Sequence, residues 1–367
     1  MLLLPLKLCK PGMRLGRPIF SDDGLVLLNE RMELTDPLIK RLAQFGIQFL
    51  YVEDSRTDDI VMNDIVSQET RSRAVSEVRT QFRKIMSEET TRKSINAMRL
   101  DVSFKSVVNS ILDDITSNSD TMMMLVNITA SDHYLFQHSV DVCIYSTVLG
   151  QAYGYSRDEL YNLSLGALLH DIGKTQLPQD VLLKPGRLTP DEFNIVKMHT
   201  TLGYQLLKDL PNVPLLSAHV AFQHHERLDG SGYPRAIAGD KIHEYAQWVG
   251  IADVYDAMTS HRVYRKAMLP HEAMEMLFIG AGTAFDKNKV ELFRDKVSIY
   301  PLGMIVKLST GEIGAVVDIN SSTPYRPIVR VLYDENRQPI SPYEVDLSKA
   351  SSVTITEANV AFEDQSA

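Results

Sequence analysis

Residues 157–174 read RDELYNLSLGALLHDIGK, and this stretch decides the class of the fold. Its apolar residues recur at spacings of three and four, which is typical of an amphipathic helix. The predicted helix ends at His170-Asp171, where an imidazole and a carboxylate can both turn toward one centre. Four further segments between residues 104 and 299 carry the same spacing, with almost no strand signal. We therefore expect a mainly α protein, built on an all-α domain at 104–299.

The segments on either side of this domain have a different pattern. Residues 1–57 combine strand-like runs with one short helix, so we expect a small α/β unit with a sensory or regulatory role. Residues 58–103 predict a helical linker, which is either a connecting helix packed on its neighbour or a dimerising stalk. Residues 300–352 predict a small β appendage made of hairpins, and residues 353–367 predict a frayed tail.

The composition narrows the classes of function. The 367 residues include 38 basic and 47 acidic side chains, and the net charge of −9 disfavours binding to the backbone of long nucleic acids. Two cysteines are too few for a disulfide framework or a cysteine-rich metal site, and they favour a reducing compartment. No run approaches the ~18 apolar residues of a membrane-spanning helix. We expect a soluble cytoplasmic protein without a membrane segment.

All ten histidines lie between residues 133 and 271. Histidine is the commonest metal ligand and the usual acid or base near neutral pH, so we expect the chemistry in this window. Five of the histidines lie on consecutive predicted helices or at their ends, where two aspartates join them. The resulting candidate ligand set is His138, His170, Asp171, His199, His224, His225 and Asp253. The remaining five are expected in packing or on the surface: His133, His219, His243, His261 and His271.

This ligand set favours two divalent metal ions. Mixed imidazole and carboxylate donors suit Fe(II), Mn(II), Zn(II) or Ni(II). Seven ligands are too many for one ion with an open position. Two ions that share a carboxylate would activate a bridging water and hold a phosphoryl oxygen. The absence of cysteine from the set argues against a structural zinc site.

Three longer motifs resemble those of a known family. They are HDIGK at 170–174, HHERLDGSGYP at 224–234 and ADVYDAMTSHRVYRK at 252–266. In this order they resemble the HD-GYP domain, which belongs to the HD superfamily of metal-dependent phosphohydrolases. The resemblance covers about residues 120–300 and implies an all-α HD-GYP helical domain. The N-terminal unit is similar, more weakly, to a small domain often found ahead of such domains.

The resemblance implies a cyclic di-GMP phosphodiesterase of bacterial signalling. The product would be linear pGpG, and in many members GMP, formed by in-line attack of a metal-bridging hydroxide. Iron or manganese is favoured, and nickel or zinc also fits the ligands. One metal would be held by His138, His170, Asp171 and Asp253. The second would be held by His199, His224 and His225, with Asp171 as the bridge.

Other motif residues receive roles through the same resemblance. Lys174 is expected to contact the scissile phosphate or to protonate the leaving oxygen, beside the catalytic Asp171; outside this motif, a solvated lysine is the default interpretation. The candidate substrate contacts in the GYP segment are Gly232, Tyr233 and Pro234. A glycine allows backbone to approach a ligand closely, and the proline favours extended geometry for the tyrosine before it. Tyr233 is expected to face a guanine or ribose, with a packing role as the alternative.

Arg262 and Arg265 are the candidate contacts of the second phosphate. They lie three residues apart on one predicted face, and these positions are basic and contact phosphate in the family. Surface salt bridges are the alternative role. Some members carry a glutamate four residues before the first histidine and hold a third metal. This chain has Tyr134 there, which predicts a dinuclear site, with a water or Asp132 as an alternative ligand.

Two other functions stay open. An HD-type phosphohydrolase of another nucleotide would not need the GYP segment. A non-catalytic receptor or adaptor would bind cyclic di-GMP and signal through its N-terminal unit, and the loss of a ligand would favour it; none is lost. The sequence is also compatible with a homodimer and with protein partners of the N-terminal unit, but it decides neither.

Overall fold

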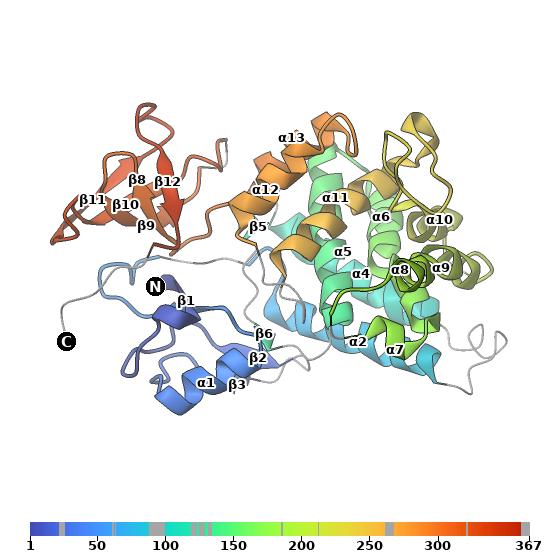
Figure 1. Cartoon of the computed structure of the whole chain (residues 1–367), viewed down its shortest axis with the longest axis horizontal. Coiled ribbons are helices and arrows are strands. Elements are labelled where there is room, and N and C mark those ends of the chain that lie inside the picture. The colour runs from blue at the N-terminus through green and yellow to red at the C-terminus, as the bar shows by residue number, and fades with distance from the viewer. Residues whose placement is uncertain are drawn as a thin grey trace. The chain divides into compact units, whose positions relative to one another are not determined.

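The chain forms two compact units in a computed structural model (Figure 1). Unit 1 comprises residues 1–64, 120–132 and 294–367, and unit 2 comprises residues 65–119 and 133–293. The structure describes residues 1–21, 26–60, 62, 64–87, 100–118, 123–124, 129–130, 134–184, 186–211, 213–260, 268–320 and 322–360.

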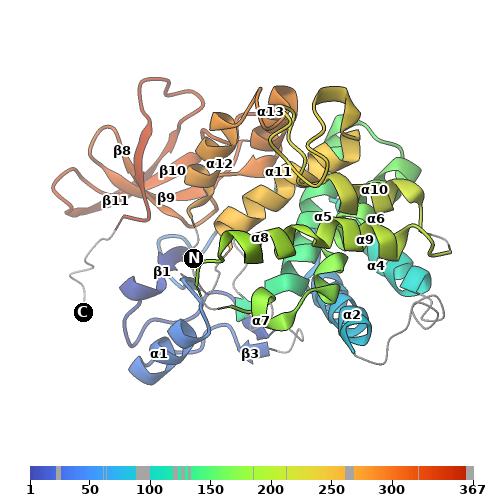
Figure 2. The ribbon, with the colours of Figure 1, turned by 45° about the vertical axis from the view of Figure 1, so that its right-hand side comes forward.

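Unit 2 is built from helices in its described residues, as expected for the helical domain, whereas about half of the whole chain is helical. Figure 2 shows α7, α8 and α9 on the side of this unit that faces the viewer. The α-helices are α2 (Gln68–Met86), α4 (Leu100–Ser117), α5 (Tyr134–Tyr153), α6 (Arg157–Leu169), α7 (Gln179–Leu182), α8 (Pro190–Lys197), α9 (His199–Leu207), α10 (Leu215–Gln223), α11 (Glu244–Thr259), α12 (Pro270–Ile279) and α13 (Lys287–Lys296), whose last residues belong to unit 1. Two 3₁₀ helices, η2 (Ile172–Gln176) and η3 (Gly239–Lys241), lie between them.

Helix α6 lies at the centre of unit 2, packed against α5 and α10. A capping box begins it: Ser156 accepts the N–H of Glu159, and the Glu159 carboxylate accepts the N–H of Ser156. The last seven residues of α6 are all buried, so its C-terminal half is covered on every side. At Gly166, a Cβ would come within 2.8 Å of Val220 on α10, so the glycine permits this close packing. The helix therefore delivers His170, its C-cap, into the interior.

In its described residues, unit 1 is built from short strands, helix α1 and the end of α13. Its largest sheet has the order β11-β10-β9-β8-β12, and the neighbouring strands are antiparallel. Its elements are β1 (Leu2–Pro5), η1 (Leu6–Leu8), β2 (Ile19–Ser21), β3 (Val26–Leu28), α1 (Asp36–Gln44), β4 (Phe49–Val52), β5 (Met123–Met124), β6 (Thr129–Ala130), β7 (Val297–Ser298), β8 (Ile305–Leu308), β9 (Ile313–Asp318), β10 (Ile328–Tyr333), β11 (Pro339–Asp346) and β12 (Ile355–Ala358).

The hairpins expected after residue 300 are present. Strands β8 and β9 pair on either side of Gly311, which has φ +91°, and β10 pairs with β11. The frayed tail expected from residue 353 is wrong for its first part, because Ile355–Ala358 form β12 and pair with β8. The N-terminal expectation is met in part. Helix α1 and strand β4 form, and β2 pairs with β3, although the turn between them lies outside the described residues. The sensory role of residues 1–57 stays a prediction.

The two ends of the chain share their hydrophobic core, which the sequence did not lead us to expect. Leu2 and Leu50 from the N-terminal strands belong to the same buried cluster as Ile305 and Leu332 from the C-terminal sheet. Residues 123–124 and 129–130, expected inside the helical domain, form strands that pair with β7 and β2. The α/β unit and the β appendage are thus parts of one compact unit.

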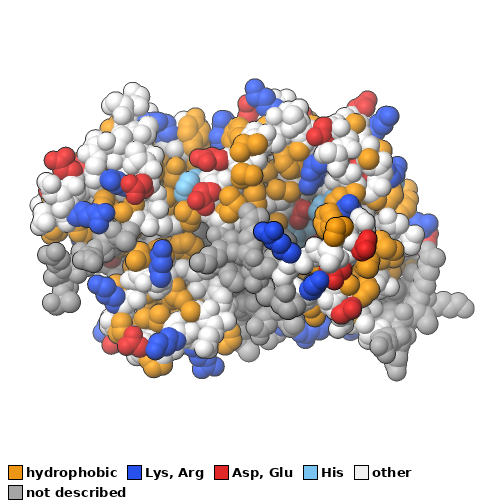
Figure 3. Space-filling model, viewed as in Figure 1, with side chains coloured by type: hydrophobic (Ala, Val, Ile, Leu, Met, Phe, Trp, Pro, Cys, Tyr) orange, Lys and Arg blue, Asp and Glu red, His pale blue; other side chains and the backbone are white. Residues whose placement is uncertain are grey.

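Some large apolar side chains remain exposed on unit 2. Met276 is 47% exposed and Ile279 is 74% exposed on α12, where hydrophobic side chains gather in Figure 3. Among the described helices, none combines the length and the apolar character that crossing a bilayer requires.

The shared core predicts that substitutions at either end of the chain destabilise the same unit. Leu50 on β4 and Leu332 on β10 are fully or almost fully buried. We expect Leu50→Ala and Leu332→Ala each to lower the free energy of unfolding by about 2–5 kcal/mol, because each leaves a cavity. Urea denaturation measures the loss. Hydrogen exchange should show faster exchange in β1 and β4 for Leu332→Ala as well.

Leu27→Ala is the matched control, because Leu27 is 46% exposed. This substitution should change the free energy of unfolding by no more than about 0.5 kcal/mol. Leu332→Ala that loosens only the C-terminal sheet, with β1 and β4 unchanged, would contradict the shared core.

Candidate metal centre

Three imidazoles in unit 2 are held in one tautomer by backbone carbonyls. Nδ1 of His170 lies 2.7 Å from the carbonyl oxygen of Ala167, and Nδ1 of His199 lies 2.7 Å from that of Val196. Nδ1 of His224 lies 3.1 Å from the carbonyl oxygen of Ala221. A carbonyl only accepts, so each Nδ1 carries the proton and each Nε2 has a free lone pair. Such outer hydrogen bonds orient histidines that bind metals.

These lone pairs face one another. The Nε2 atoms of His199 and His224 are 3.3 Å apart, and both are acceptors when Nδ1 carries the proton. The Nε2 atoms of His138 and His170 are also 3.3 Å apart. Two acceptors at this distance repel each other unless a cation or a proton lies between them. The geometry therefore suits a bound cation between His199 and His224, and a cation or a proton between His138 and His170.

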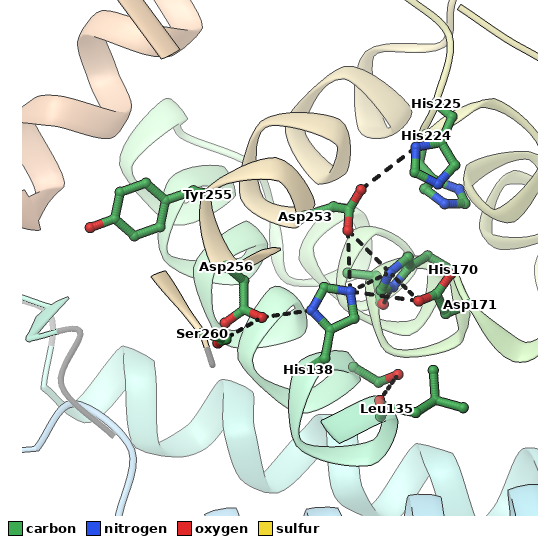
Figure 4. A network of polar contacts seen from close by, with 12 residues as sticks. Leu135, His138, His170, Asp171, His224, His225, Asp253, Tyr255, Asp256 and Ser260 are labelled. Atoms are coloured by element: carbon green, nitrogen blue, oxygen red, sulfur yellow. Dashed lines mark hydrogen bonds and ion pairs between the residues drawn. The ribbon is translucent and has the colours of Figure 1, made fainter. Parts of the chain in front are cut away.

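His138 is oriented by a residue that the sequence did not single out. Its Nδ1 lies 2.6 Å from Oδ2 of Asp256, and its Nε2 lies 3.1 Å from Oδ1 of Asp253 (Figure 4). The two aspartates are three residues apart on α11, so they share one face of that helix. That spacing within the motif is the signal that could have identified Asp256.

Asp171 stands between the two groups of imidazoles. Its Oδ2 lies 3.4 Å from Nε2 of His170 and 3.6 Å from Nε2 of His138. Its other oxygen, Oδ1, lies 3.4 Å from Nε2 of His199 and is buried without a hydrogen-bond partner. A buried carboxylate oxygen without a partner is costly, and a metal ion would satisfy it.

The predicted ligand residues come together as two groups within the described part of the chain. The ligand atoms of each group lie within 4.8 Å of one another. Asp253 adds a second carboxylate: Oδ1 faces His138, and Oδ2 lies 3.7 Å from Nδ1 of His225. The groups are His138, His170 and Asp171, and His199, His224 and His225. Five imidazoles and two carboxylates fit two borderline divalent ions.

The surroundings of the candidate metal ligands keep most of them unprotonated. Burial lowers the pKa of His199 to about 4 and holds those of His224 and His225 well below the usual range. Burial alone would raise the pKa of the Asp171 carboxyl, but the charge of Lys174 holds it well below its usual value.

His138 is the exception among the imidazoles. Burial would lower its pKa, but the hydrogen bonds and charges of Asp253 and Asp256 raise it to about 9. Without a metal ion, Nε2 of His138 therefore carries a proton at neutral pH. A divalent ion would take the place of that proton, so metal binding at this group releases it.

Lys174 lies at the edge of the buried ligands, as the motif predicts. Its ammonium pairs with Oδ2 of Asp171, and its side chain is 18% exposed. The turn that places it depends on Gly173, where a Cβ would lie 1.9 Å from the carbonyl oxygen of His199. The backbone of η2 thus approaches α9 as closely as only glycine permits.

The GYP segment lies over the second group of imidazoles. The ring of Tyr233 stacks on His225, with centroids 4.6 Å apart and an angle of 28° between the planes. At Gly232, a Cβ would meet the backbone of His225 and Glu226 at 2.4 Å. Close packing therefore requires a glycine at this position, whether or not it contacts a substrate. Pro234, which follows through a cis peptide bond, is exposed.

Glu226 holds this segment in place, another role that sequence reasoning missed. Its side chain is buried, and its carboxylate accepts the N–H of Arg235 at 2.9 Å and of Ile237 at 3.1 Å. A buried charge that receives backbone donors rigidifies a loop. A glutamate directly after two histidines carries no local signal of such a role.

Some predicted residues cannot be placed. Arg262, Arg265 and His261 lie outside the described residues, as do Asp132 and His133. Tyr134 begins α5, but its side chain is outside the described part. Among the other predicted packing histidines, His243 accepts the N–H of Tyr245 at the start of α11. The ring of His219 lies beside that of Tyr204.

Two parts of the sequence match known families. Residues 122–288 match the family described as HD domain, and residues 305–365 match the KOW domain associated with HD domain. A cyclic di-GMP phosphodiesterase of Pseudomonas aeruginosa is 34% identical over 258 residues, which are 70% of this chain and 61% of that protein.

Two further relatives match shorter stretches. The cyclic di-GMP phosphodiesterase response regulator RpfG of Xanthomonas campestris is 41% identical over 39% of this chain and 38% of its own. The 3′3′-cGAMP-specific phosphodiesterase 3 of Vibrio cholerae is 33% identical over 47% of this chain and 38% of its own. The chain thus spans less than two thirds of the length of each of these three relatives.

The contact between Asp256 and His138 predicts an effect on metal affinity. Asp256→Asn keeps a hydrogen-bond acceptor for Nδ1 of His138 but removes its negative charge. We expect the affinity for Mn(II) or Zn(II) to fall about 10- to 100-fold, as is typical when an outer partner of a ligand histidine is lost. Competition with a fluorescent chelator measures the affinity.

Asp158→Asn is the matched control, because Asp158 is exposed in the first turn of α6. An unchanged affinity in Asp256→Asn would show that Asp256 does not orient a metal ligand.

Proposed function

We propose that this chain, which belongs to the HD-GYP family of HD-domain proteins, is a metal-dependent phosphodiesterase that hydrolyses cyclic di-GMP to pGpG and then to GMP. The observation that carries the proposal is the convergence of five imidazoles on the carboxylates of Asp171 and Asp253, with the free lone pairs of His199 and His224 facing each other. The names of two relatives support the substrate.

The donor set supports two metal ions. We favour iron or manganese, and nickel or zinc also suits these donors. Bound there, the ions would supply Lewis acidity and an activated water. The first ion would be held by His138, His170, Asp171 and Asp253. The second would be held by His199, His224 and His225, with Asp171 shared.

The residues of the chain orient the ligands and hold a proton. The carbonyl partners of His170, His199 and His224 fix the tautomer in which Nε2 can bind. Lys174 keeps an ammonium beside Oδ2 of Asp171, at the partly exposed edge of a buried site. From there it would contact the scissile phosphate or donate its proton to the leaving 3′ oxygen.

A second substrate deserves the same assay. The Vibrio cholerae relative is named for a mixed guanine–adenine cyclic dinucleotide, so 3′3′-cGAMP is the second candidate. A receptor without catalysis is disfavoured, because every ligand of both groups is present. Comparing the kcat/KM values for the two dinucleotides decides the specificity.

The test uses the full chain, purified without oxygen and loaded with Mn(II) or Fe(II). We expect cyclic di-GMP to yield pGpG and then GMP, with the products resolved by chromatography, and a chelator to stop the reaction. The double variant His170→Ala/Asp171→Ala should lose metal content and at least 1000-fold in rate, because it removes donors of both ions, and such metal-site losses are of the order of several kcal/mol.

His219→Ala is the matched control, since His219 is a half-buried histidine of α10 outside both groups. Tight binding of cyclic di-GMP without turnover under every metal would identify a receptor instead. Activity that survives the double variant would place the chemistry elsewhere.

A further inference from the structure

Beyond the ligand groups, a row of rings leads out toward α8. Tyr233 stacks on His225 and also meets His199 edge-on, with centroids 6.4 Å apart and an angle of 80°. On its other side, Phe193 of α8 meets Tyr233 in the same edge-on manner, also at 6.4 Å and 80°. Phe193 is therefore separated from two candidate metal ligands by a single ring.

Helix α8 presents this side chain to solvent. Phe193 is 45% exposed, and α8 contains no buried residue, so core packing does not explain an aromatic side chain there. The ammonium of Lys197 lies 4.7 Å from the centroid of Phe193 and 5.7 Å from that of Tyr233. A cation over two rings is an attractive arrangement. It also places a positive charge beside the metal site of an acidic chain.

The position of α8 is fixed by the residues at both of its ends. A capping box between Thr189 and Glu192 begins it, and Lys184 pairs with the Glu192 carboxylate at 2.7 Å. Its last residue, Lys197, lies two positions before the candidate ligand His199, which is in α9. Phe193 and Lys197 are thus held at a set distance from the centre, which a binding subsite requires.

We propose that Phe193 and Lys197 form a subsite for a purine base and the non-scissile phosphate of the substrate, an inference that rests on the proposed cyclic dinucleotide phosphodiesterase activity. Bases stack on exposed aromatic rings, and such stacking tolerates either purine. The Lys197 ammonium would attract the second negative charge of the dinucleotide. The subsite would bind the part of the substrate that the metal ions do not hold.

The test separates binding of the base from the reaction at the metal ions. Phe193→Ala should raise the KM for cyclic di-GMP about tenfold, because a stacking platform is lost. The kcat/KM for methyl p-nitrophenyl phosphate, a diester without a purine, should change less than twofold. Phe193→Tyr should restore the KM. Phe278→Ala is the control, because Phe278 is a partly exposed phenylalanine of α12.

The charge is tested by Lys197→Met, which keeps the length of the side chain. We expect a KM for cyclic di-GMP that is several-fold higher and less sensitive to added salt, since an ion pair is lost. Lys208→Met is the matched control, because Lys208 also lies over a tyrosine ring, that of Tyr204, at 5.8 Å.

The outcomes distinguish this inference from the proposed function. A wild-type protein that cleaves the small diester but neither cyclic dinucleotide would defeat the proposed function, and the subsite with it. Wild-type turnover of cyclic di-GMP with an unchanged KM in Phe193→Ala would defeat the subsite alone. Equal losses for both substrates in Phe193→Ala would show that Phe193 supports the metal centre and not the base.

Discussion

The carboxylate of Asp171 is the group on which the geometry of unit 2 depends. Each of its oxygens faces a different group of imidazoles, and one oxygen also pairs with the Lys174 ammonium. A buried carboxylate is stable only when opposite charges and donors surround it. These charges and donors reach the carboxylate because α6 ends at Leu169, two residues before Asp171, and because η2 turns against α9 at Gly173. Helix termini, and not helix faces alone, therefore assemble the centre.

The same dependence extends outward from the centre. The tautomers of three histidines are set by carbonyls three residues earlier in the chain. The carbonyls for His170 and His224 lie in the helices that these residues end, whereas the carbonyl for His199 comes from α8, the helix before its own. Asp256 does the same for His138 from a different helix. Farther out, Glu226 fixes the segment that carries Tyr233, and the capping box of α8 fixes Phe193. The ligand histidines, the segment of Tyr233 and helix α8 are thus each held in place by an identifiable hydrogen bond.

Much of this arrangement was predictable from the sequence, because the motifs are local. His170-Asp171 and His224-His225 are adjacent pairs at helix ends, and the spacing of apolar residues gave the helices that carry them. Asp256 was not predicted, because an aspartate on a helix usually faces solvent and only the fold shows His138 opposite it. The row of rings from His225 through Tyr233 to Phe193 was also not predicted, because it joins residues from two segments through ring contacts alone. The shared core of unit 1 was missed for a similar reason. The alternation of apolar residues in a strand shows that one face is buried, but it does not show which distant segment covers that face.

That shared core has a consequence for how the chain is made. The partners of Leu2 and Leu50 in the core include Ile305 and Leu332, which a ribosome adds about 250 residues or more later. Domains fold as units during synthesis, generally from the N-terminus. Here the order is inverted: the first strands must wait, with apolar surface uncovered, while the residues of the helical unit emerge and pack. Unit 1 closes last, after the helical unit has packed, so early aggregation would begin at the N-terminal strands of unit 1 and not in the helical unit.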